Sequence, residues 1–236
     1  MTRHFGALIP STNTTVEIEY TRLLPPTLQA HYARLGKERG VPFMPSRKDD
    51  LEYQSKMLGN AKVEAIGLIQ TSASLFEDDY DAVAKLTMTD NSGAPAITSA
   101  EAIGQAVRAL GAERIALVSP YSEDVIGRAK RYYETRFGLE VLATEAFGAT
   151  DSYAIGGLSA DNATDAFARI DRPEIEVLVV PGGNFPTMKY VADWERQFNK
   201  PVITTNQAVI WSVMLAMDIR EPLAGMGRLF LELPAA

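Results

Sequence analysis

The sequence contains no cysteine and only two histidines, His4 and His31, among its 236 residues. The absence of cysteine excludes disulfides, thiolate nucleophiles and sulfur-ligated metals. Two histidines are too few for an imidazole metal cluster. Neither follows a predicted strand, so Ser-His-Asp catalysis finds no support.

The sequence also has no excess of basic residues: it contains 23 Lys and Arg and 30 Asp and Glu, which gives a net charge of −7. Nucleic acids and anionic membranes need a basic patch, so neither is predicted as a partner. No apolar run approaches the roughly 20 residues that span a bilayer. Pro10 and the polar STNTT end the first apolar run, which excludes a signal peptide and makes the cytoplasm the expected location.

Short apolar runs alternate with helical patterns along the chain, which indicates an α/β fold with parallel sheets. The runs predict strands at 5–10, 63–70, 94–98, 114–120, 174–183 and 200–205. Helices are predicted at 99–111, with a Ser99 cap, and at 122–138, with a Ser122 cap and a terminal Gly138. A third helix, 206–218, is apolar nearly all round, which favours a core position. A dimer face stays open, so a homo-oligomer is possible.

An internal repeat organises these elements. Three pairs of positions have similar offsets: Pro95 and Pro201 (201 − 95 = 106), Leu8 and Leu117 (117 − 8 = 109), and Gln70 and Gly182 (182 − 70 = 112). The repeat predicts two pseudo-symmetric α/β units, one formed by 1–111 with 206–236 and the other by 112–205.

Four loops that follow predicted strands are expected to converge on a cleft between the units, because ligands of open α/β sheets bind at the carboxyl ends of strands. The loops are PSTNTT (10–15), QTSAS (70–74), SPYSED (119–124) and PGGN (181–184). Hydroxyls, amides and backbone N–H groups dominate them. Such neutral donors suit a carboxylate, or the enediolate that forms when a proton or CO2 leaves the neighbouring carbon. Each loop alone could equally be a helix cap.

The glycines of VVPGGN raise a similar alternative, because Gly-Gly after a strand is often only a turn. The pattern is neither GxGxxG nor a Walker loop, so no nucleotide site is predicted. Tyr121 is a candidate hydroxyl donor. Glu17 is a possible base, although an acidic residue at a helix N-terminus is the simpler interpretation. The segment 149–157, with Asp151 and Tyr153, could cover the cleft or merely connect two elements.

The ordered set PSTNTTVE, Thr71-Ser72, the PY at 120–121, GGNFPT and ITTNQAVIW resembles the maleate cis-trans isomerase and arylmalonate decarboxylase group of the aspartate/glutamate racemase superfamily. The resemblance runs in the same order over nearly the whole chain. It implies two Rossmann-like halves with one active site between them, and chemistry on a small carboxylic acid without cofactor or metal.

In that superfamily, cysteines at two strand ends act on opposite faces of the substrate. The resemblance places the first cysteine position at Gln70 and the second at Gly182. Gly182 is preferred to Pro181 because an ungapped run from it brings Trp194-Glu195-Arg196 and Pro201 into the family's register. The chain therefore departs from the family at both positions, which implies that thiol-based chemistry is lost.

The remaining pocket residues match the family. Thr71, Ser72, Tyr121 and Gly183 resemble the decarboxylase's donor set, and Asn13 matches an asparagine of the isomerases. The predicted site residues are Gln70, Tyr121 and Gly182 as catalytic positions, with Ser11, Asn13, Thr71, Ser72, Gly183 and Asn184 binding the substrate.

Two classes of function follow. One is a cofactor-independent isomerase or decarboxylase-like lyase that works without cysteines, or a hydrolase that uses a pocket-activated water. The other is a non-catalytic protein that binds a small carboxylate. A cysteine-depleted engineered variant is a third, weaker explanation.

Overall fold

Eight strands form two parallel sheets in the computed structural model, which describes residues 1–36 and 43–231. The first sheet has the order β2-β1-β3-β4 and the second the order β6-β5-β7-β8. The strands are β1 (Arg3–Pro10), β2 (Leu28–Leu35), β3 (Ile66–Leu68), β4 (Ala96–Thr98), β5 (Arg114–Ser119), β6 (Glu140–Ala146), β7 (Val177–Val180) and β8 (Val202–Thr204). The predicted α/β class and the two parallel sheets are confirmed.

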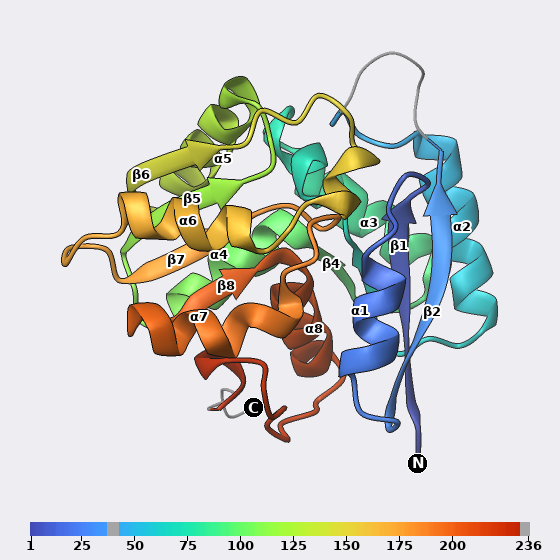
Figure 1. The fold of residues 1–236 in the computed structure, drawn as a ribbon. Helices are drawn as coiled ribbons and strands as arrows, with labels where there is room; N and C mark the ends of the chain where they lie inside the picture. The colour runs from blue at the N-terminus through green and yellow to red at the C-terminus, as the bar shows by residue number, and fades with distance from the viewer. Residues whose placement is uncertain (37–42, 232–236) are drawn as a thin grey trace.

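The two sheets repeat one another, as the sequence offsets predict. Leu8 and Leu117 lie on the equivalent strands β1 and β5, and Gln70 and Gly182 follow the equivalent strands β3 and β7. Figure 1 shows the sheets side by side, with β1 and β2 in blue and the second sheet in green to red. The loops that follow β1, β3, β5 and β7 all contribute residues to one cavity wall.

The edge strands β2 and β6 are absent from the sequence-based prediction. Both lie at the outer edge of a sheet and include partly or fully exposed residues. They therefore lack the continuous apolar run by which buried parallel strands are recognised. The central strands β1, β5 and β7 are almost entirely buried and were predicted.

Helices cover both sheets. They are α1 (Val16–Leu23), α2 (Lys48–Asn60), α3 (Tyr80–Ser92), α4 (Ser99–Ala109), α5 (Glu123–Phe137), α6 (Asp161–Ile170), α7 (Val191–Phe198) and α8 (Thr205–Ala216). Ser122 caps α5 through its hydroxyl, and Gly138 ends that helix with φ 58°. Ser99 is not the cap of α4 as predicted. It is the first helical residue, and its hydroxyl instead donates to Thr71 Oγ1.

The last helix, α8, is buried over most of its length. It packs against α4, β3 and β4. Gly67 of β3 allows this approach, because a Cβ there would lie 2.9 Å from Val209 Cγ1. The division into 1–111 with 206–236 and 112–205 remains a prediction, and its last five residues lie outside the described part of the chain.

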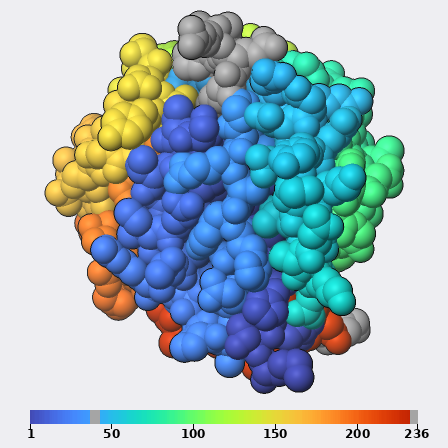
Figure 2. Space-filling model, turned by 90° about the vertical axis from the view of Figure 1, so that its right-hand side faces the viewer, coloured from blue at the N-terminus to red at the C-terminus, as the bar shows by residue number. Residues whose placement is uncertain are grey.

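The 150–157 segment bridges the two halves at the surface. Figure 2 shows the face built from the blue to teal first half, with the yellow segment near residue 150 at its edge. A Cβ at Gly156 would lie 2.2 Å from Thr14 Oγ1, so a larger residue there would have to displace the Thr14 side chain. Within residues 1–36 and 43–231, no helix has the length and apolarity needed to cross a membrane.

Candidate active site

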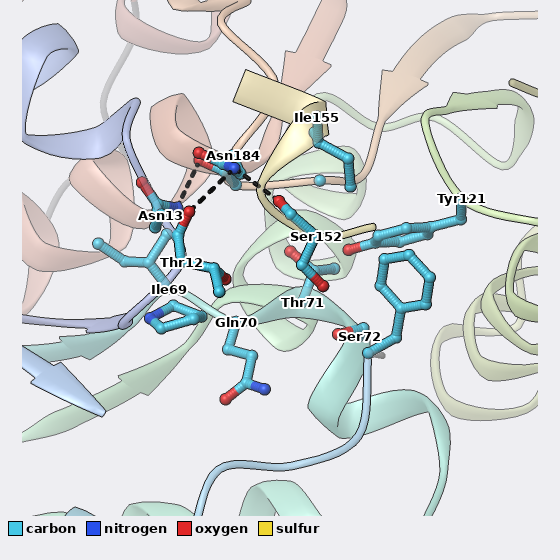
Figure 3. Close-up of a pocket in the computed structure, with 14 residues that line it drawn as sticks. Thr12, Asn13, Ile69, Gln70, Thr71, Ser72, Tyr121, Ser152, Ile155 and Asn184 are labelled. Atoms are coloured by element: carbon cyan, nitrogen blue, oxygen red, sulfur yellow. Dashed lines mark hydrogen bonds between the residues drawn. The ribbon is translucent and has the colours of Figure 1, made fainter. Parts of the chain in front are cut away.

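A cavity of about 40 Å³ lies where the strand-end loops meet. This is room for about three waters, at roughly 10–15 Å³ each. Its wall contains every predicted site residue except Ser11. The lining residues are Pro10, Thr12, Asn13, Phe43, Ile69, Gln70, Thr71, Ser72, Tyr121, Ser152, Ile155, Gly182, Gly183 and Asn184. Figure 3 shows these side chains arranged around the cavity.

Tyr121 is one of the buried polar residues of this wall. Burial raises the pKa of its phenol well above the ordinary value, and hydrogen bonds from the side chains of Thr71 and Ser72 and from the Ser72 backbone offset only part of that effect. Phe43 packs edge-on against the ring, with centroids 5.2 Å apart. Tyr121 therefore stays protonated near neutral pH and acts as a hydrogen-bond donor.

A chain of hydroxyls joins the two units beneath the cavity. Ser99 Oγ donates to Thr71 Oγ1 at 3.3 Å, and Thr71 Oγ1 lies 3.0 Å from Thr205 Oγ1. Thr205 in turn accepts from the backbone N–H of Gly182 at 2.8 Å. Thr205 was missed as a site residue. The repeat carried the signal, since the offset between Pro95 and Pro201 also relates Ser99 to Thr205.

Asn13 and Asn184 hold three loops together. Asn13 Oδ1 accepts from the N–H groups of Thr15 and Val16, which fixes the turn into α1, and its Nδ2 donates to the Gly183 carbonyl at 3.1 Å. Asn184 Oδ1 accepts from Thr14 N at 2.8 Å.

The Asn184 Nδ2 group donates to the Ser152 carbonyl at 2.8 Å and to the Thr12 carbonyl at 3.5 Å. These bonds, drawn in Figure 3, close the 150–157 segment onto the cavity. Both asparagines thus shape the wall mainly through its backbone.

Gln70 and Gly182 occupy the positions at which the resemblance implies cysteine. The Gln70 carboxamide is engaged elsewhere: Oε1 accepts from Ser46 Oγ at 2.7 Å, and Nε2 donates to the Met44 carbonyl at 2.8 Å. In Figure 3 it points away from Tyr121 and Asn184. Gly182 has φ 143°, a conformation that favours glycine, and a Cβ there would lie 3.0 Å from Pro120 Cγ.

The acidic residues Glu17 and Asp151, which the sequence places near the predicted loops, do not line the cavity. Glu17 pairs with Arg34, whose guanidinium also donates to the Asn13 carbonyl. Asp151 accepts from Tyr153 N, and the Tyr153 side chain is exposed. Ser152 and Ile155, from the same segment, line the cavity instead.

The histidines also lie outside the cavity wall. His4 Nδ1 lies 3.0 Å from His31 Nε2 on the neighbouring strands β1 and β2. The described residues contain no group of three His, Cys, Asp or Glu side chains placed to hold a metal ion. The lining side chains themselves are neutral near pH 7.

Comparison with known proteins settles the family. The arylmalonate decarboxylase family model matches residues 46–230. The chain belongs to this family. It is 26% identical to a maleate isomerase of Pseudomonas putida, with 95% of both chains covered. It is also 27% identical to an arylmalonate decarboxylase of Bordetella bronchiseptica over 70% of each chain.

Solved structures of maleate isomerases and of arylmalonate decarboxylase have the same fold as this chain. A Pseudomonas putida maleate isomerase with maleate superposes with a TM-score of 0.86 at 23% identity, covering 99% of this chain and 100% of that one. Unliganded arylmalonate decarboxylase gives a TM-score of 0.80 at 22% identity, covering 97% and 99%. The family's named members are isomerases and lyases, so the chain is a member of an enzyme family.

Proposed function

We propose that this chain is a cofactor-independent isomerase or decarboxylase-like lyase that acts on a small carboxylic acid without a cysteine. The observation that carries the proposal is the cluster of buried hydroxyls formed by Tyr121, Thr71 and Ser72 on the cavity wall. Neutral donors fixed in a buried site hold a carboxylate, and they stabilise an enediolate more strongly as its charge develops.

In a decarboxylation, the bond between CO2 and the substrate's α-carbon breaks, and its electron pair passes into the remaining carboxylate as an enediolate. Tyr121, Thr71 and Ser72 stabilise these oxygens. The α-carbon then takes a proton. Because burial keeps Tyr121 protonated, the phenol serves as a donor to oxygen rather than as a base. A water admitted to the cavity supplies the proton, and the hydroxide that remains combines with the released CO2 as bicarbonate.

The absence of cysteine distinguishes this route from that of the relatives. One solved Nocardia farcinica maleate isomerase carries a covalently bound succinylcysteine intermediate. This chain has no thiol with which to form such a bond. We assign the two implied cysteine positions to Gln70 and Gly182. Gln70 anchors the 44–46 segment and Gly182 allows the close turn against Pro120.

A second candidate is a non-catalytic carboxylate-binding protein. The neutral character of the lining side chains favours it, because proton transfer is usually assigned to a titratable group within reach of the substrate. A hydrolase is less well supported, because the Gln70 carboxamide is held by Ser46 and Met44 rather than directed at a water in the cavity.

Proton NMR in D2O tests these candidates. Purified protein is incubated with maleate, malonate, phenylmalonate, amino acids and 2-hydroxy acids. A new product, or deuterium incorporated next to a carboxylate, is expected for the enzyme. Ligand-induced shifts without product or exchange would favour the binding protein. Absence of both with every acid would contradict the proposed substrate class.

A further inference from the structure

Glu19 is a buried carboxyl group behind the cavity wall. It lies on α1 and is only 6% exposed. Oε1 accepts from the backbone N–H of Met188 at 2.8 Å, and Oε2 accepts from Asn206 Nδ2 at 2.6 Å. Within the described part of the chain it has no salt-bridge partner. A buried carboxylate held only by neutral donors is costly to ionise.

Asn206 links this carboxyl group to the cavity. Its Nδ2 group donates both to Glu19 and, at 3.1 Å, to the carbonyl of Gly183, which Asn13 Nδ2 also reaches. Gly183 lines the cavity. Glu19 is therefore two hydrogen bonds from a backbone carbonyl of the wall.

The other amide atom of Asn206 is unsatisfied. Oδ1 is buried and has no hydrogen-bond partner in the described structure. It lies against the cavity wall, 3.2 Å from where a Cβ of Gly183 would stand. A buried acceptor without a partner is unusual, so the present amide orientation must be imposed by its other contacts.

We propose that Glu19 is a positioning residue whose protonation state sets how firmly it holds the Asn206 amide and, through its charge behind the wall, the strength of carboxylate binding. When ionised, Glu19 is a charged acceptor that holds Asn206 Nδ2, which also donates to the Gly183 carbonyl. When protonated, Glu19 is a weaker, neutral acceptor, and the Nδ2 group is left mainly to the Gly183 carbonyl. The effect on binding rests on the proposed function; the coupling of the two side chains does not.

The surroundings of Glu19 allow its carboxyl group to gain or lose a proton near neutral pH. Burial raises its pKa to about 7, against the opposing hydrogen bonds from Asn206, Met188 and Thr187. Lys189, which follows Met188, is the charged group that acts on it. Arg34 of β2 is engaged by Glu17, and the neighbouring Tyr20 donates to the Asn206 carbonyl. The residues of α8 carry no titratable side chain.

Protonation of Glu19 removes a buried negative charge behind the cavity wall, which favours the binding of an anionic ligand. Carboxylate affinity should therefore rise as pH falls through about 7, with proton uptake on binding. For unit charges roughly 12 Å apart at an effective dielectric constant near 20, an effect of about tenfold is expected.

The first test uses the free protein. The side-chain amide resonances of Asn206, assigned by their loss in Asn206→Ser, are followed by ¹H–¹⁵N NMR from pH 5 to 9. In the wild type they should shift with a midpoint near 7. In Glu19→Gln they should stay constant over that range. Glu195→Gln is the matched control, because Glu195 is another buried carboxyl with a raised pKa but does not line the cavity. It should leave the transition unchanged.

The second test measures binding of maleate by calorimetry at pH 6 and pH 8, in two buffers of different ionisation enthalpy. Relative to Glu19→Gln, in which maleate's own titration is the same, wild type and Glu195→Gln should bind maleate up to about tenfold more tightly at pH 6 than at pH 8. They should also take up a fraction of a proton on binding at pH 8, where Glu19 is ionised before the ligand binds. Asn206 resonances that fail to titrate in the wild type, or that still titrate in Glu19→Gln, would overturn the proposal. Asn206 titration without maleate binding at either pH would uphold the Glu19 coupling and count against the proposed function for this acid.

Discussion

Replacing Gly182 by cysteine restores a thiol at the implied position, and the structure predicts that the fold resists it. The φ of 143° is one that residues with a Cβ rarely adopt, and holding such a conformation costs on the order of 1–3 kcal/mol. The new Cβ would also lie 3.0 and 3.1 Å from two carbons of the Pro120 ring. Crowding of this kind adds about 1 kcal/mol or more. We expect Gly182→Cys and Gly182→Ala each to lower the free energy of unfolding by about 2–4 kcal/mol.

Urea denaturation followed by circular dichroism measures this loss. Gly127→Ala is the matched control, because Gly127 lies within α5 and a Cβ there meets nothing within 4 Å. That substitution should stabilise the protein by up to about 1 kcal/mol. If Gly182→Ala were as stable as wild type, the backbone at this position would not require glycine, and the explanation for the missing thiol would be wrong.

Three further predictions concern the site. Tyr121→Phe should weaken maleate binding by about 10- to 100-fold, since a hydrogen bond to a charged group contributes roughly 1.5–3 kcal/mol. Calorimetry measures this affinity, and an unchanged value would show that Tyr121 does not bind the ligand. Asn184→Ala should lower the free energy of unfolding by about 2 kcal/mol and reduce hydrogen-exchange protection at the Thr14 amide, because the hydrogen bonds of the Asn184 side chain with Thr14 and Ser152 are lost. Full protection of the Thr14 amide in this variant would contradict the prediction. Burial raises the pKa of Glu19 from 4.5 to about 7, so the folded state binds this proton more tightly than the unfolded chain does. Between those pH values the wild type should therefore lose stability with rising pH relative to Glu19→Gln, by up to about 3 kcal/mol in urea titrations, and parallel curves would refute the raised pKa.

Much of the fold was predictable because the central strands are buried on both faces. Their apolar runs, such as 114–120, are continuous, and the repeat located the second sheet from the first. Some missed elements carried a usable signal. In α2, the buried residues Leu51, Ser55 and Leu58 recur at helical spacing. The edge strands β2 and β6 gave a weaker sequence signal, because their exposed positions interrupt the apolar run by which a buried strand is recognised.

The site was predictable in its loops but not in its connections. Strand-end loops of equivalent strands must meet, so the hydroxyls of Thr71 and Ser72 were found from the repeat. Phe43 and Ile155 reach the cavity from segments outside the repeat's matched loops. Glu19 would pass for an ordinary acidic residue in the first turn of a helix. Its hydrogen bonds are made with Asn206 and Met188, which lie far along the sequence and meet α1 only in the folded chain.

The central claim is that Thr71 and Ser72, with Tyr121, hold a carboxylate. Calorimetric titration of the Thr71→Ala/Ser72→Ala double variant with maleate, malonate and phenylmalonate tests it most directly. Ser74→Ala is the matched control, because Ser74 lies in the same segment but its hydroxyl bonds to Asp81 and does not line the cavity. The account predicts that the double variant loses at least tenfold in affinity for the acids that wild type binds, whereas Ser74→Ala retains it. Equal affinity of the double variant and wild type for every acid would show that the carboxylate binds elsewhere.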